Sequence, residues 1–354
     1  MGRKSWEEYL AEQELLERKK ERESIKEEKR IESEKILSKD EIRKYTKYGP
    51  KNPLLELDKM IGMDSVKEQI NRLISQFLFE KERKNAGIVS RVNTCNHMCF
   101  LGPAGTGKTT VARIMTSILY QNGYIKENKM IEITGSQLTG IYLGQTKERT
   151  RLFIEAAKGG VLFLDEAYSL NTGTSGDSYS QEATAMLVKA MEDNKNDFVL
   201  IIAGYKDLTN RWLSSNEGLK SRIRLTIDFP DFTPDECVEI LKGFSRKDNM
   251  TCSEELLSEY KRYISNLQSL SNKCKHYNVP TYHFSNARQV RNDEKALLNV
   301  HAESYVAKKI PSDKRDVFVS EDIICLKNEC IRLMKEFDNE MLKRGYKRVE
   351  EKKS

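Results

Sequence analysis

The stretch HMCFLGPAGTGKTT, residues 97–110, decides the fold of this chain of 354 residues. It begins with the apolar run His97–Leu101 and continues through a glycine-rich segment to Lys108 and Thr109. The segment matches the pattern G-x-x-x-x-G-K-[ST] in full, and a helical pattern follows it. A strand, a glycine-rich turn and a helix in this order predict a phosphate-binding loop. A chance glycine-rich turn is the alternative that the full match disfavours.

The chemistry of this loop points to a nucleoside triphosphate. Glycines let the backbone curl so that N–H groups face a phosphate, and the N-terminus of the next helix adds positive potential. Lys108 can reach the β- and γ-phosphates, and the Thr109 hydroxyl can ligate Mg²⁺. We therefore predict ATP and Mg²⁺ as cofactors. The candidate contacts are Gly102, Pro103, Ala104, Gly105, Thr106, Gly107, Lys108, Thr109 and Thr110.

A second signal is the run VLFLDE, in which two acids follow four apolar residues. Asp165 is placed to hold Mg²⁺, and Glu166 to polarise a water for attack on the γ-phosphate. An apolar run that ends in two acids is common by itself and usually marks a solvated strand end. Its place 57 residues after Lys108 makes the catalytic interpretation strong. A water-activating Glu also argues against a small-molecule kinase, which must exclude water.

Five apolar runs alternate with helical patterns up to about residue 232. This alternation predicts an α/β domain with a parallel five-stranded sheet covered on both faces. After Pro230 the pattern becomes helical, with a helix start at Thr233-Pro-Asp-Glu236 and a last helix from about Ser320. We expect a charged helical extension at 1–50, an α/β domain at 51–232 and an all-α domain at 233–354. The runs are 98–101, 130–133, 161–164, 198–203 and 225–229.

The motifs, in this order, make the chain resemble the AAA+ ATPases and, more closely, the CbxX/CfqX family. That family includes red-type Rubisco activase and the stage V sporulation protein K. The resemblance covers most of residues 55–295 and implies a P-loop AAA+ large domain followed by a helical lid. It is carried by LDKMIGMDSVKEQI (57–70), FLGPAGTGKTTVARIM (100–115), GGVLFLDEAYSL (159–170), QEATAMLVKAMED (181–193), LIIAGYKD (200–207), LKSRIRLTIDFPDF (219–232) and FSNARQVRN (284–292).

The resemblance implies further nucleotide contacts. Ile61 and Gly62 lie where such proteins pack the adenine, although both could be merely core and turn. Arg288 corresponds to the sensor-2 arginine that contacts the γ-phosphate from the same chain, whereas Arg291 is expected to pack or pair. Tyr205 stands at the sensor-1 position, where many AAA+ proteins have Asn. Its different reach leaves its sensing role open.

Arg222 corresponds to the arginine finger, which acts on nucleotide bound by the neighbouring subunit. Arg224 is the nearby rival, and an ordinary surface arginine is the alternative to both. If the finger assignment holds, a monomer should hydrolyse ATP poorly. The resemblance therefore implies a homo-oligomeric ring, expected to be a hexamer.

The loop SQLTGIYLGQTKERT contains an aromatic–hydrophobic–Gly triplet, Tyr142, Leu143 and Gly144. The triplet resembles the pore loop of protein-threading AAA+ rings. The aromatic would grip a polypeptide, and the glycine would let the loop move. A buried aromatic that anchors the loop is the competing explanation. The segment Asn171–Ser180 could be a second pore loop or a plain connection.

Charge is high and nearly balanced, with 60 Lys and Arg against 54 Asp and Glu. The balance argues against a dedicated nucleic-acid binder, and no apolar run approaches the ~18–20 residues of a membrane span. Seven scattered cysteines favour reduced thiols and a cytoplasmic location. Of the first 50 residues 27 are charged, against 87 of the other 304. Residues 1–50 are therefore a solvated helix, a mobile tail or a partner-docking segment.

These observations favour an ATP-driven ring motor that remodels or threads an unidentified protein client. A nucleic-acid-handling AAA+ ATPase is one alternative, although it should present basic residues at the pore. An ATP-controlled assembly switch or scaffold is the other, in which the charged N-terminal segment would be the functional part.

Overall fold

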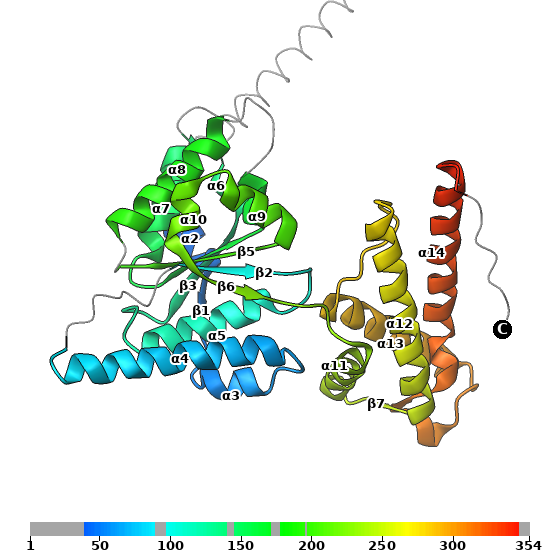
Figure 1. The fold of residues 1–354 in the computed structure, drawn as a ribbon. Coiled ribbons are helices and arrows are strands. Elements are labelled where there is room, and N and C mark those ends of the chain that lie inside the picture. Colours follow the sequence, from blue (N-terminus) through cyan, green and yellow to red (C-terminus); the bar gives the residue numbers. More distant parts are fainter. Residues whose placement is uncertain (1–38, 89–96, 140–144, 171–177, 195–196, 347–354) are drawn as a thin grey trace, which may run out of the picture.

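The computed structural model describes residues 39–88, 97–139, 145–170, 178–194 and 197–346. These residues form a large α/β body built on one sheet and a smaller helical lid beside it (Figure 1). The chain passes from the sheet to the lid after the last strand of the large body. This order confirms the predicted α/β fold with a helical C-terminal part.

The large body is organised around a six-stranded sheet with the order β1-β3-β4-β5-β2-β6. Its five parallel strands coincide with the five predicted apolar runs. Three central strands are buried on both faces, which is why they read as unbroken apolar runs. The parallel strands are β2 (His97–Leu101), β3 (Lys129–Thr134), β4 (Val161–Asp165), β5 (Val199–Gly204) and β6 (Ile223–Asp228).

The sheet has one strand more than the five parallel strands that were predicted. A sixth strand, β1 (Thr46–Tyr48), pairs antiparallel with β3 at one edge, and the short helix α2 (Lys39–Tyr45) precedes it. The Tyr45 ring packs edge-on against Phe153 at 5.3 Å between centroids. Residues 39–48, which we assigned to the charged extension, therefore lie on the large body. A three-residue edge strand without an apolar run leaves little pattern to detect.

Helices cover both faces of the sheet (Figure 1). Helix α4 shows the principle, because Val66, Ile70, Leu73 and Phe77 recur at helical spacing and are all buried. Burying one such side chain contributes roughly 1.5–3 kcal/mol. The helices of this body include α3 (Pro53–Asp58), α4 (Asp64–Asn85), α5 (Lys108–Gln121), α6 (Gly135–Leu138), α7 (Gln145–Ala157), α8 (Ser178–Asp193), α9 (Lys206–Ser214) and α10 (Glu217–Arg222).

The first lid helix, α11, begins at the helix start that the sequence predicted. Thr233 and Glu236 form a reciprocal capping box, and Pro234 occupies the first turn of α11. One correction concerns the class of the lid: Thr251–Cys252 (β7) and Val317–Phe318 (β8) form a small parallel pair in a part expected to be all-α. Each of these strands has only two residues, too few to give a strand pattern in the sequence. The lid helices are α11 (Pro234–Lys247), α12 (Glu254–His276), α13 (Ala287–Val306) and α14 (Ile324–Lys343).

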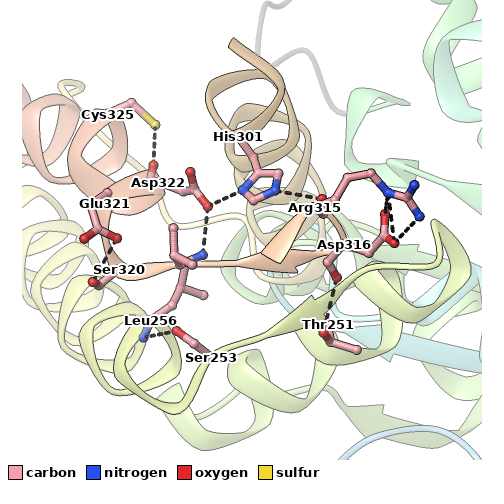
Figure 2. Close-up of polar contacts among 11 residues, drawn as sticks. Thr251, Ser253, Leu256, His301, Arg315, Asp316, Ser320, Glu321, Asp322 and Cys325 are labelled. Carbon is pink, nitrogen blue, oxygen red and sulfur yellow. Dashed lines mark hydrogen bonds and ion pairs between the residues drawn. The ribbon is translucent and has the colours of Figure 1, made fainter. Parts of the chain in front are cut away.

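A buried polar network joins the far end of the lid to this strand pair (Figure 2). His301 Nδ1 lies 2.8 Å from Asp322 Oδ2, and Nε2 lies 2.9 Å from the Arg315 carbonyl oxygen. The backbone N–H of Val319 donates to the same Asp322 oxygen at 2.8 Å. Both ring nitrogens of His301 therefore lie within hydrogen-bonding distance of an oxygen. The network fixes the turn into α14 against α13.

A second buried network lies between α12 and α13 around Asp293, which is 2% exposed. Its carboxylate accepts hydrogen bonds from the hydroxyls of Tyr260 and Tyr263 and from the side-chain amide of Gln289. Burial nevertheless raises the pKa of Asp293 to about 6, against the opposing effect of these three donors. Desolvation of the charge therefore outweighs the hydrogen bonds.

We expect Asp293 to make the lid less stable as pH rises from about 4 to about 6. The folded protein keeps this proton longer than the unfolded chain does, so unfolding is hardest at the acid end of that window. Asp293→Asn removes the titration. The difference in unfolding free energy, native chain minus variant, should fall by on the order of 2–3 kcal/mol across the window in urea titrations. Parallel curves for the two proteins would refute this.

Candidate functional site

The phosphate loop lies at the carboxyl end of β2 and leads into the N-terminus of α5. Gly105 and Gly107 have φ of +74° and +87°, a region that favours glycine. Close approach adds a second requirement at Gly105. A Cβ there would stand 2.0 Å from the carbonyl oxygen of Ser285, a residue of the lid. The loop is thus shaped both to expose its N–H groups and to touch the lid.

Lys108 extends back over this loop. Its ammonium group donates to the carbonyl oxygens of Gly102 at 2.9 Å and Pro103 at 2.6 Å. Burial lowers the pKa of Lys108, and the nearby charge of Asp165 opposes that shift. A partly desolvated cation at a helix N-terminus is suited to a phosphate, which would take the place of the loop carbonyls.

A cleft of about 360 Å³ opens over the loop between the large body and the lid. Both parts of the chain contribute to its lining. The lining residues are Gly102, Ala104, Gly105, Thr106, Gly107, Lys108, Thr109, Thr110, Asp165, Glu166, Tyr168, Gly204, Tyr205, Phe244, Ala287, Arg288 and Arg291. The structure thus brings the predicted loop, the two predicted acids, Tyr205 and Arg288 together in one cavity. Of the predicted loop contacts, only Pro103 does not line it.

The two acids sit where β4 ends. Asp165 Oδ1 accepts a hydrogen bond from the Glu166 backbone N–H at 2.9 Å. Glu166 has φ of +48°, in the left-handed region that non-glycine residues rarely occupy. Such strain costs of order 1–3 kcal/mol and is typical of active sites. The chain therefore turns sharply at Glu166, the candidate water-activating residue.

Two tyrosines form the wall next to these acids, and sequence reasoning identified only Tyr205. Tyr168 packs against Tyr205 with 5.8 Å between ring centroids. Burial, followed by the charge of Glu166, raises the pKa of Tyr168 to about 12, so its hydroxyl stays protonated and can donate. Gly204 makes room for this ring, because a Cβ there would lie 2.9 Å from it. The sequence signal that could have identified Tyr168 is its position three residues after Asp165.

The lid closes the other side of the cleft with Arg288 and Arg291 from α13 and Phe244 from α11. The Arg291 guanidinium stacks over the Phe244 ring at 4.9 Å, which agrees with the packing role expected for it. Phe244 was not predicted, because only the folded chain brings it to the phosphate loop. Two cations face the loop from the lid, an arrangement suited to the charge of a triphosphate.

The predicted adenine contacts lie beside the cleft rather than in its lining. Gly62 has φ of +61° and faces the Glu236 carboxylate of the lid so closely that a Cβ would overlap it. Ile61 packs against the core that continues into the lid. The neighbouring methionine methyl groups of Met60 and Met63 approach Gly107. Gly62 and Ile61 therefore lie against the lid, and their contact with a base stays a prediction.

Arg222 ends α10 and does not line the cleft of its own chain. It donates to Glu192 Oε2 at 2.8 Å and to the Gly218 carbonyl oxygen at 2.9 Å, with 28% of its side chain exposed. Its rival Arg224 is exposed on β6. The predicted pore loop, Tyr142, Leu143 and Gly144, and most of the segment Asn171–Ser180 lie outside the described residues.

Cleft, loop and paired acids define a P-loop ATPase of the AAA class. Residues 98–230 match the AAA family, described as the ATPase family associated with various cellular activities. The FIGL-1 AAA domain shares the fold, with a TM-score of 0.52 at 14% identity over 84% of this chain and 93% of that one. A Thermotoga maritima RuvB variant superposes with a TM-score of 0.50 at 20% identity, covering 81% and 76%.

The chain belongs to the CbbX/CfxQ/CbxX family of Rubisco activase-like AAA+ ATPases. It is 36% identical to protein CbbX of Cereibacter sphaeroides over 284 residues, 79% of this chain and 88% of that protein. It is 39% identical to the chloroplastic ribulose bisphosphate carboxylase/oxygenase activase of Cyanidioschyzon merolae over 238 residues, 67% and 77% of the two chains. This confirms the family resemblance and identifies an ATP-hydrolysing enzyme.

The residues present fit ATP and Mg²⁺, the cofactors of this family. Gly105 and Gly107 hold the loop backbone in a curled, positive-φ conformation, and the Lys108 ammonium donates to loop carbonyls that a phosphate can replace. Thr109 and Asp165 supply the oxygen donors that Mg²⁺ prefers. Among the described residues, no helix is long and apolar enough to cross a membrane.

Proposed function

We propose that this protein is a ring-forming motor that uses ATP hydrolysis to remodel or thread a protein client. The observation that carries the proposal is that one cleft is lined by both the large body and the lid. A nucleotide bound there contacts both parts, so a change in its phosphates changes the contact between them. The membership in a family with Rubisco activases supports work on a protein. These relatives do not identify the client of this chain.

Within the cleft we assign roles by position. Lys108 and the loop N–H groups, including those of Gly105 and Gly107, hold the β- and γ-phosphates. Thr109 and Asp165 hold Mg²⁺, which when bound neutralises charge on the phosphates. Glu166 accepts a proton from the attacking water, and Arg288 contacts the γ-phosphate from the lid.

We propose that Arg222 completes the site of a neighbouring subunit. Its place outside its own cleft and its partial exposure support action in trans. The Glu192 carboxylate holds it in the single chain, and in a ring a phosphate would compete for that guanidinium. This role requires a closed homo-oligomer, which we expect to be a hexamer.

We further propose that Tyr142, Leu143 and Gly144 form the client-gripping loop, on the strength of the sequence pattern. Residues 1–50 are the proposed site for partner docking, because the family resemblance does not extend to them. We propose a cytoplasmic location, which the free thiols of the six cysteines in the described residues support.

The test places a photo-crosslinking amino acid at position 142 of the Glu166→Gln ring, which should bind ATP without turnover. In cells that produce the protein naturally, we expect ATP-dependent adducts with polypeptide other than the ring itself. Position 120, an exposed tyrosine at the end of α5, serves as the control for random surface labelling. Adducts with DNA or RNA would favour the nucleic-acid alternative, and adducts only with neighbouring subunits would favour the scaffold.

A further inference from the structure

Asn286 joins three segments that lie far apart in the sequence. It is fully buried just before helix α13 of the lid. Its side-chain amide donates to the Ala104 carbonyl oxygen of the phosphate loop at 3.2 Å and to Asp231 Oδ1 at 2.8 Å. Its side-chain oxygen accepts from the Phe232 backbone N–H at 2.8 Å. One side chain thus binds the phosphate loop, the lid and the segment that connects the two bodies.

The backbone of Asn286 is held in an unfavourable conformation. Its φ of +54° and ψ of −131° lie in a region that glycine adopts easily and other residues adopt with strain. Asn commonly caps a helix at this position by accepting from the first-turn N–H groups. Here no side-chain cap bond is made, because the amide is directed to the other segments. The three side-chain hydrogen bonds of Asn286 therefore offset both the backbone strain and the missing helix cap.

The neighbouring contacts extend the same connection. The Ala287 backbone N–H donates to the Gly105 carbonyl oxygen at 3.2 Å. The Gln268 side-chain amide, from α12, donates to the Phe232 carbonyl oxygen at 2.6 Å. Arg288, the lid arginine of the cleft, follows Asn286 by two residues. A shift of the phosphate loop therefore acts directly on the start of α13.

We propose that Asn286 is a positioning residue that clamps the phosphate loop to the lid. It sets the place of Arg288 over the loop and couples the phosphates of the nucleotide to the orientation of the lid. It does not line the cleft, and acts through Ala104 and Arg288. The inference concerns the ATP site alone, so it holds whether the motor acts on protein or on nucleic acid.

Asn286→Gly separates the clamp from the backbone conformation. Glycine accepts the positive φ and removes all three side-chain bonds. We expect the variant to lose preference for ATP: the Kd for ATP should rise about tenfold, the typical effect of one hydrogen bond, while the Kd for ADP changes less. The kcat should fall as well. Asn249→Gly, an exposed Asn with φ of +57° at the end of α11, is the matched control and should leave these values unchanged.

A side-chain exchange tests the contact directly. Asn286→Asp keeps the acceptor for the Phe232 N–H but sets a carboxylate against Asp231 and the Ala104 carbonyl oxygen, so the ATP preference should fall. Adding Asp231→Asn returns a donor to the pair and should restore part of that preference. Thermal unfolding of each nucleotide-free variant accompanies the measurement.

Two outcomes would overturn the proposal. One is an Asn286→Gly protein with the ATP-to-ADP affinity ratio and kcat of the native chain. The other is a loss of activity that follows the fraction of unfolded protein, with an unchanged affinity ratio in the folded fraction and no rescue by Asp231→Asn. Either would make Asn286 a structural residue only. Neither outcome depends on the client, so neither one tests the proposed remodelling function.

Discussion

Glu166→Gln should reduce ATP hydrolysis by at least about 100-fold while ATP still binds. The amide keeps the size of the carboxylate and cannot accept the proton of the attacking water. Phosphate release measures turnover, and titration with a fluorescent ATP analogue measures affinity. Because bound ATP is no longer consumed, we also expect the ring to be more stable in size-exclusion chromatography.

The Glu166 prediction has a clear control and a clear failure. Glu303→Gln changes an exposed carboxylate on α13 of the lid and should leave turnover at the level of the native chain. Normal hydrolysis by Glu166→Gln would show that Glu166 is not the catalytic base and would contradict the proposed site. A variant that fails to bind ATP would instead make Glu166 a binding residue.

Arg222→Ala should reduce kcat by about 1,000-fold, the lower end of the effect of arginine fingers. The guanidinium is outside its own cleft, so ATP affinity should stay near that of the native chain. Phosphate release at saturating ATP measures the loss. The rival, Arg224→Ala, changes an exposed residue on β6 and should leave kcat nearly unchanged. The reverse result would move the finger to Arg224.

Much of the fold followed from simple patterns because buried parallel strands leave unbroken apolar runs. All five parallel strands were predicted, although only the three central ones are buried on both faces, and the phosphate loop and the two acids lie in one cleft as the strand ends required. Strand β1 was not predicted because its three residues, Thr46–Tyr48, contain no apolar run. The pair β7–β8 escaped because each strand has only two residues.

The residues missed at the site depend on tertiary contact rather than on local pattern. Phe244 and Tyr168 line the cleft only because the lid and the turn after β4 bring them there. Asn286 stands 182 residues from Ala104 in the chain, and its strained backbone and diverted cap are visible only in the fold. Sequence patterns predict groups that share one element, whereas such long-range contacts need the assembled structure.

The measurement that tests the shared ATP site most directly mixes two inactive proteins. Glu166→Gln subunits lack the base but carry Arg222, and Arg222→Ala subunits lack the finger but carry Glu166. In a mixed ring, an Arg222→Ala subunit beside a Glu166→Gln neighbour has both groups at one site. We predict that mixing restores ATP hydrolysis well above either protein alone. If Arg222 acts within its own chain, or if no ring forms, the mixture will stay as inactive as its components.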